Sequence, residues 1–289
     1  MHDNLTTYYL QANEHSGLEF EMQFMPQFFI DHASGPMEPH RHDFYQIIWF
    51  QQGHGTHQVD FVDYPVADNT IFFVAPGQVH AFDTNTDDKG VVIHFNASFL
   101  NDEDSPESLF LKYNVFNNCN HAPYCKVSRE EEKRLMNIVN ELNREYSLTN
   151  AFAHHDYMAY LIRLFLIRVQ RSGERDSKEE FYVSNNANVV FVRFRQLLEQ
   201  NFTKIHTVKE YASMLGVSQR SLNEYVRESS SRTPLQIINE RIALEAKRQI
   251  RHSPLSIKEI GYQLGFDDPS NFVKFFKRVT GERPTDYRL

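Results

Sequence analysis

The chain has 289 residues, enough for about two domains that each bury a core of their own. Its formal net charge of −8 is unevenly distributed: residues 189–289 carry 17 Lys and Arg against 11 Asp and Glu, whereas residues 1–188 carry 13 against 27. The two cysteines, Cys119 and Cys125, argue against a disulfide framework and against a zinc knuckle. A basic C-terminal third attracts phosphates, and an acidic front part should stay off nucleic acid.

The first ten residues lack the basic and then apolar plan of a secretory signal peptide. No stretch approaches eighteen uninterrupted apolar residues, so we expect no contact with a membrane. These features favour a cytoplasmic protein whose cysteines are ordinary thiols.

Short β-rich runs alternate with turn residues between Phe20 and Phe95. The pattern predicts strands at residues 44–50, 56–61, 69–74 and 89–95, separated by glycine- and proline-containing turns. Many short strands with regular turns favour a barrel or a sandwich. Taken one by one, the aromatic residues of this region fit a core, and together they fit the wall of a small-molecule pocket.

Helical periodicity follows the strands. Ser128 and Glu131 have the spacing of a capping box at the start of one helix, and residues 151–171 predict a second helix. Their apolar stripes fit either a cover for the barrel or the seam of a symmetric dimer. The polar stretch from Ser172 to Glu180 predicts an interdomain linker that runs to about residue 188.

Residues 207–227 have the pattern of a helix-turn-helix. A short helix with one apolar face ends at Gly216, because glycine tolerates the left-handed conformation of a tight exit. Ser218 is a suitable N-cap for the next helix, in which Leu222 and Val226 face the core. The side chains left outward suit base edges and phosphates, and they are Gln219, Arg220, Asn223 and Arg227.

The same pattern recurs about fifty residues later. A helix at residues 257–264 is followed by a turn, and Asp268 and Pro269 provide an N-cap and a first helical residue for a helix at 269–280. Its inner face is phenylalanine-rich. Its outward side chains are Ser270, Asn271, Lys274, Lys277 and Arg278.

Residues 234–251 predict one longer helix between the two motifs. A rigid spacer of this kind lets two recognition helices enter successive major-groove segments about 34 Å apart on one face of B-DNA. The sequence therefore predicts a two-site reader of double-stranded DNA.

Residues 201–289 resemble the AraC/XylS family of bacterial transcription regulators. The run GFDDPSNFVKFFKRVTGERPTDYR at residues 265–288 matches the signature of that family nearly throughout. The resemblance implies promoter DNA and RNA polymerase as partners, and activation as the commoner mode. It places Gln219, Arg220, Asn223 and Glu224 at base-reading positions of the first motif, and Ser270, Asn271 and Lys274 at those of the second.

Two positions depart from the family pattern. Glu224 is acidic where such helices are often basic, so it either accepts a hydrogen bond from a cytosine amino group or weakens the grip of the first motif. Ser231 stands where the second motif has Gly281.

The order of His40-Arg-His42 before a strand and Pro76-Gly-Gln-Val-His80 after a later one resembles a cupin barrel, the sensing domain common in the same family. In cupin enzymes such histidines and a nearby carboxylate bind a metal. Three imidazoles can hold zinc or iron, but Gln46 stands where the carboxylate would be, so we expect no metal and no other cofactor. We expect instead a small organic effector, a sugar or an aromatic acid, bound by His40, His42, Tyr45, Trp49 and His80.

The predicted architecture is a multidomain α+β chain. It comprises a cupin-like barrel at residues 1–125, a helical dimerisation segment at 126–171, a linker at 172–188 and an all-α double helix-turn-helix domain at 189–289. The expected function is a homodimeric transcription regulator, not an enzyme, that responds to its effector. A cupin-type metal-dependent protein fused to a DNA-binding domain and a ligand-independent regulator are the alternatives.

Overall fold

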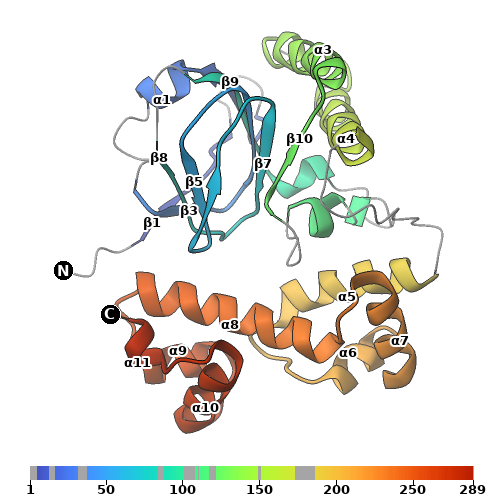
Figure 1. The fold of residues 1–289 in the computed structure, drawn as a ribbon. Coiled ribbons are helices and arrows are strands. Elements are labelled where there is room, and N and C mark those ends of the chain that lie inside the picture. Colours follow the sequence, from blue (N-terminus) through green and yellow to red (C-terminus); the bar gives the residue numbers. More distant parts are fainter. Residues whose placement is uncertain are drawn as a thin grey trace. The chain divides into compact units, whose positions relative to one another are not determined.

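The computed structural model describes residues 5–12, 17–31, 38–83, 88–100, 108–109, 111–116, 122–148, 151–172 and 186–288. The chain divides into two compact units, one of residues 6–179 and one made mainly of residues 180–289. The first combines strands with helices and the second is helical, as Figure 1 shows, which confirms the expected fold class. Cys119 and residues 173–185 of the expected linker lie outside the described residues.

Two five-stranded sheets form the barrel, with strand orders β1-β3-β8-β5-β6 and β10-β7-β4-β9-β2. The described pairs are antiparallel apart from β1 and β3. The strands are β1 Thr6–Tyr8, β2 Phe20–Met25, β3 His40–His42, β4 Tyr45–Gln52, β5 Thr56–Val59, β6 Val62–Pro65, β7 Thr70–Val74, β8 His80–Asp83, β9 Lys89–Phe95 and β10 Tyr124–Lys126.

The four expected strands are confirmed as β4, β5, β7 and β9, each within two residues at either end. Successive side chains of a strand point to opposite faces, so β4 and β7 each contribute to two cores. Ile48, Phe50 and Phe72 belong to the cluster inside the barrel. On the opposite face of β4, Trp49 packs against Phe165, with ring centroids 6.1 Å apart.

The expected helix pair is confirmed as α3 Arg129–Tyr146 and α4 His154–Ser172, which pack together beside the barrel in Figure 1. Ser128 caps α3, since its side chain accepts from the Glu131 N–H. The second half of the expected capping box is absent, because the Glu131 carboxylate accepts from Arg168 of α4 at 2.6 Å instead. Three shorter helical turns in this unit are α1 Gln27–Asp31, a 3-10 turn at Ala97–Leu100 and a π turn at Leu111–Val115.

The C-terminal unit consists of helices around one core. The helices expected at 234–251, 257–264 and 269–280 are confirmed, the last of them to the residue. The helices are α5 Asn186–Asn201, α6 Val208–Met214, α7 Gln219–Ser230, α8 Pro234–His252, α9 Ile257–Gln263, α10 Pro269–Thr280 and α11 Pro284–Tyr287.

Helix α8 connects the two motifs and lies in their common core. Ile238, Ile242 and Ala246 are fully buried in the same cluster as the inner residues of both motifs. The guanidinium of Arg241 bonds Glu199 of α5 at 2.8 Å and Glu245 at 3.2 Å. This ion pair fastens α5 to α8, and with it the first motif to the spacer.

The two motifs end in the same way despite their different residues. Ser231 follows α7 and Gly281 follows α10, and both take the left-handed conformation, with φ of 55° and 86°. Each N–H bonds a carbonyl four residues back, to Arg227 and Lys277 respectively. Serine at position 231 therefore leaves the end of the helix unchanged. Its Cβ causes steric strain in the left-handed conformation that glycine would not have.

Candidate functional site

The first motif presents α7 as its outer helix. Ser218 caps α7 by accepting from the Ser221 N–H at 3.0 Å, while Leu222 and Val226 are fully buried. This anchoring turns the opposite face of α7 to solvent. The five predicted contact residues of α7 are exposed or half-buried on that face, namely Gln219, Arg220, Asn223, Glu224 and Arg227.

Two hydrogen bonds order the exposed face of α7. The Asn223 amide donates to the Gln219 carbonyl at 2.8 Å. The Arg220 Nε donates to the Glu224 carboxylate at 2.9 Å, although the Arg220 side chain is 89% exposed. Glu224 therefore partly neutralises the cation beside it in the free protein.

The second motif is anchored by the same devices. Ser256 and Glu259 form a capping box on α9, and the Asp268 carboxylate caps α10 by accepting from the Ser270 N–H at 2.7 Å. Phe272 and Phe276 are fully buried beneath α10. The five predicted contact residues of α10 are all exposed, namely Ser270, Asn271, Lys274, Lys277 and Arg278.

The barrel interior gathers the three predicted histidines. The His80 ring lies 4.2 Å from the His40 ring and 4.9 Å from the His42 ring, measured between centroids. Two histidines that the sequence did not single out join them. His57 approaches His80 with 3.1 Å between Nε2 and Nδ1, and His94 accepts from the Gln46 amide at 2.8 Å.

Tyr45 and Trp49 do not lie with these histidines. Tyr45 stacks on Phe95 and contacts Phe116, and Trp49 packs against α4, so both occupy the opposite face of the sheet. The reason is the two-residue period of β4, which turns Gln46 inward and its neighbour Tyr45 outward. The predicted five-residue effector set is thus divided between two faces.

Burial keeps the interior imidazoles neutral. It lowers the pKa of His42 and that of His57 to about 3, and it holds the pKa of His80 well below 6.5. Mutual repulsion among the rings lowers these pKa values further. Several buried polar atoms find no hydrogen-bond partner among the described residues, including Nε2 of His42, Nε2 of His80 and Oε1 of Gln46.

Gln46 leaves the histidine cluster without the carboxylate of a cupin metal site. No group of three His, Cys, Asp or Glu side chains within the described ranges is arranged to hold one. The Gln46 amide is engaged with His94, whereas Nδ1 of His42 faces the Phe44 carbonyl at 2.7 Å and leaves Nε2 of the same ring without a partner among the described residues.

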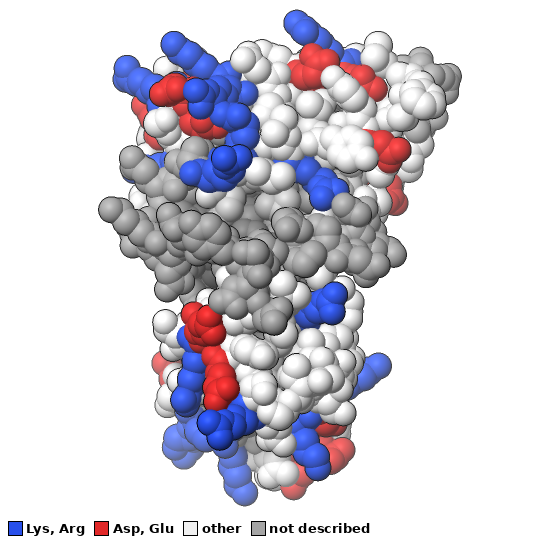
Figure 2. All heavy atoms as spheres, turned by 90° about the vertical axis from the view of Figure 1, so that its right-hand side faces the viewer, with Lys and Arg blue, Asp and Glu red and all other residues white. Residues whose placement is uncertain are grey.

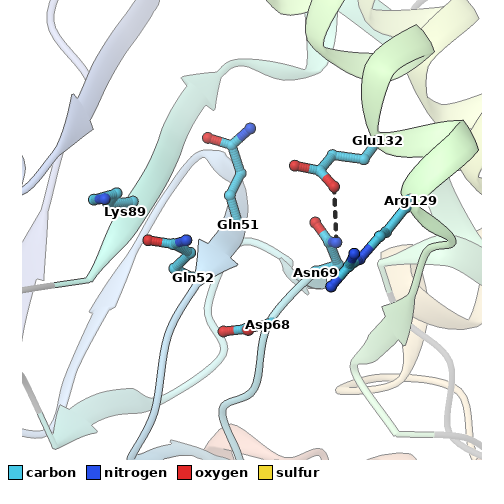
Figure 3. A pocket seen from close by; sticks show the side chains of 7 residues that line it. All are labelled: Gln51, Gln52, Asp68, Asn69, Lys89, Arg129 and Glu132. Carbon is cyan, nitrogen blue, oxygen red and sulfur yellow. Dashed lines mark hydrogen bonds between the residues drawn. The ribbon is translucent and has the colours of Figure 1, made fainter.

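A hollow on the surface of this unit is polar and open. It has a volume of about 410 Å³ and lies between the end of β4 and the first turn of α3, where Asn69 donates to Glu132 at 2.9 Å (Figure 3). Cations and carboxylates alternate around it and none of its side chains is buried, as expected of solvated surface. Its lining is Gln51, Gln52, Asp68, Asn69, Lys89, Arg129 and Glu132.

Comparison with known proteins supports both halves of this arrangement. Residues 29–146 match a family model described as an AraC-like ligand binding domain, and residues 211–289 match one described as a helix-turn-helix domain. The HTH-type transcriptional activator RhaS of Klebsiella pneumoniae is 23% identical over 258 residues, which cover 86% of each chain. The chain belongs to the AraC family of DNA-binding transcription regulators.

The family assignment rests on most of the chain. The HTH-type transcriptional activator RhaR of Cronobacter sakazakii is 23% identical over 259 residues, again 86% of each chain. Apart from that assignment, the solved structure of ToxT of Vibrio cholerae is similar at a TM-score of 0.39 and 14% identity, covering 93% of this chain and 97% of its own. AraC-family proteins are transcription regulators, not enzymes. In the part of the chain that the structure describes, no helix is long and apolar enough to cross a membrane.

The buried histidines make the stability of the barrel depend on pH. Because His57 is neutral when folded and titrates near 6.5 when unfolded, its contribution is complete above pH 6.5 and is lost as the pH falls toward 3. We expect His57→Phe to flatten the fall in unfolding free energy below pH 6.5 by up to about 1.4 kcal/mol per pH unit. Urea unfolding followed by the fluorescence of Trp49, the one tryptophan of the chain, measures this slope.

Phe72 provides the control, because its ring centroid lies 4.6 Å from that of His57 and its side chain has no titratable group. Phe72→Leu should lower stability equally at every pH. If the unfolding free energy of His57→Phe depends on pH as steeply as that of the wild type and of this control, the buried His57 is not the source of the pH dependence.

Proposed function

We propose that this protein is a sequence-specific transcription activator whose promoter binding is controlled by a small uncharged effector in the N-terminal barrel. One observation carries the proposal: two recognition helices are anchored by equivalent caps and cores on one spacer. The names of RhaS and RhaR, both transcriptional activators, support activation. RNA polymerase is the partner that we infer for an activator. Such a protein acts on DNA in the cytoplasm.

The geometry of α8 supports reading of two adjacent DNA segments. Its 19 residues span about 28 Å, close to the roughly 34 Å between successive major-groove segments. Both outer helices present amides and cations, the groups that read base edges and phosphates. We assign base reading to the N-terminal halves of α7 and α10, which carry Gln219, Arg220, Asn223, Ser270 and Asn271.

Substitution of Arg220 tests base reading. We expect Arg220→Ala to weaken binding to the preferred duplex by about 1–3 kcal/mol and to reduce the difference in binding free energy between preferred and random DNA. Lys209→Ala removes a cation of α6 outside the predicted set and should keep that difference. Titration with a duplex selected from a random pool measures both, and equal losses on both DNAs for Arg220→Ala contradict base reading.

The chemistry of the barrel interior favours a sugar over an aromatic acid. The His42 Nδ1–H donates to the Phe44 carbonyl, which leaves Nε2 as a hydrogen-bond acceptor, and Oε1 of Gln46 is a second one. Hydroxyl groups donate to such acceptors. A carboxylate needs donors or cations, and the lowered pKa values make imidazolium unfavourable there. We therefore assign the effector to uncharged polyhydroxy compounds.

A ligand titration tests the effector site. A sugar that binds should raise the unfolding free energy by about 2.7 kcal/mol at one hundred times its dissociation constant, and it should change promoter affinity. His42→Phe removes the acceptor and should abolish both effects, while Tyr45→Phe, on the other face of the sheet, should keep them. Binding of an aromatic acid alone contradicts the assignment. Loss of the response after chelation favours the metal-dependent alternative. The absence of a response to every sugar and aromatic acid tested favours the ligand-independent regulator.

We also assign dimerisation to α4. Tyr157, Tyr160, Leu164 and Ile167 follow the 3,4,3 spacing of a coiled-coil seam and are between 38% and 66% exposed. Figure 2 looks onto the side of the molecule that carries α3 and α4, where uncharged surface separates clusters of charge. An apolar stripe of this length suits a second copy of the same helix.

A charge in the stripe tests the dimer. We expect Leu164→Glu to convert a dimer into a monomer, because two carboxylates would face each other across a two-fold seam, and to reduce promoter affinity through lost avidity. Sedimentation or light scattering measures the mass. Leu164→Met keeps the apolar side chain and should keep the dimer, whereas a wild-type protein that is monomeric at high concentration contradicts the assignment.

A further inference from the structure

A pocket of about 560 Å³ lies between the second helix-turn-helix motif and the segment that leads into the first. Its walls come from the segment just before α6, from the first two turns of α8, and from α10 with the turn before it. The lining residues are His206, Leu235, Asn239, Phe266, Asn271, Lys274, Phe275 and Arg278.

The lining combines cations, amides and apolar rings, and it contains no carboxylate. Lys274 and Arg278 are exposed, and the Arg278 guanidinium lies 5.8 Å from the centre of the Phe275 ring. Leu235 is 49% exposed although it is apolar. The mixed-charge hollow at α3 has two carboxylates, so the two pockets differ in chemistry as well as in place. The pocket at α10 suits an anion that has an apolar body.

Helical spacing separates the pocket side of α10 from its other exposed side. Asn271, Lys274 and Arg278 are three and four residues apart, so they share one side of the helix, and all three line the pocket. Ser270 and Lys277 are seven residues apart and lie outside the lining. Lys274 is therefore on the side that faces the segment before α6 and the first two turns of α8.

The pocket is preformed, because its two walls touch. Gly265 has φ of 81°, and a Cβ placed there would lie 2.3 Å from the carbonyl oxygen of Thr203. Next to this contact, the rings of His206 and Phe266 pack with centroids 4.9 Å apart. The segment before α6 is thus held directly against the turn before α10.

DNA geometry supplies the anion. Two recognition helices in successive major-groove segments straddle the intervening minor groove, whose two phosphate backbones must pass between the motifs. We infer that the pocket binds one phosphodiester of the promoter with its deoxyribose. Lys274 and Arg278 pair with the phosphate, the Asn239 amide donates to it, and the apolar side chains contact the sugar. This inference rests on the proposed DNA binding, and it makes Lys274 a phosphate contact instead of a base reader.

Single methylphosphonates in the selected duplex, which remove one phosphate charge at a time, test the pocket. We expect the full-length protein to lose about tenfold in affinity at one phosphate between the two half-sites. Lys274→Met should bind preferred and random DNA about tenfold more weakly, reduce the salt slope by about one, and no longer respond to that methylphosphonate. Lys258→Met removes another exposed lysine, in α9 outside the pocket, and this variant should respond like the wild type.

The outcomes separate the pocket from DNA binding itself. A wild-type protein that binds no duplex overturns the proposed function. A wild-type protein that binds but has no sensitive central phosphate overturns the pocket alone, as does a Lys274→Met variant that stays sensitive or that relaxes sequence preference. Binding of inorganic phosphate or deoxycytidine monophosphate in a Lys274-dependent way, without a methylphosphonate effect, assigns the pocket to a free phosphate ester and overturns its DNA role.

Discussion

The buried ion pair between α5 and α8 is the constraint on which the DNA-binding unit depends. Arg241 is 11% exposed, bonds carboxylates of both helices, and lies with its guanidinium carbon 3.8 Å from the centre of the Phe202 ring. Removing one partner of such a pair typically costs about 3–5 kcal/mol, because the other charge remains buried. Its geometry fixes α5 on α8, and the first motif takes its orientation from both.

The N-terminal unit depends on the opposite arrangement, in which polar groups are buried without charge. Five histidines and Gln46 occupy an interior that is otherwise aromatic and aliphatic. Neutral imidazoles can be buried at moderate cost, whereas imidazolium cannot. An interior of this kind keeps hydrogen-bonding capacity available to a ligand while the barrel remains folded.

Much of the C-terminal unit could be predicted from the sequence, because its signals are local. Asp268, Pro269 and Gly281 mark the ends of α10 independently of the rest of the chain. Ser231 shows the limit of such signals. It takes the left-handed conformation, although glycine and not serine is the residue that predicts this conformation.

The barrel interior could be predicted only in part, because its signals are not local. Every residue from Tyr45 to Phe50 is buried, so no alternation of polar and apolar residues shows which side chains of β4 face inward. His57 and His94 lie in strands β5 and β9, and only the sheet pairing brings them to His80 and Gln46. The partner of Glu131 is also distant in the sequence, because Arg168 is 37 residues away and only the packing of α3 against α4 brings the two together.

The contact between Gly265 and Thr203 affects which DNA targets the protein can bind. The backbone of the Gly265 turn lies against Thr203 at a separation that no side chain could occupy. If both outer helices read DNA as proposed, this contact between the turn before α10 and the segment before α6 helps to set the angular offset between the two motifs around the double helix. A target whose two half-sites are moved apart by a base pair presents the second one about 34° out of phase, and a rigid reader cannot rotate to follow it.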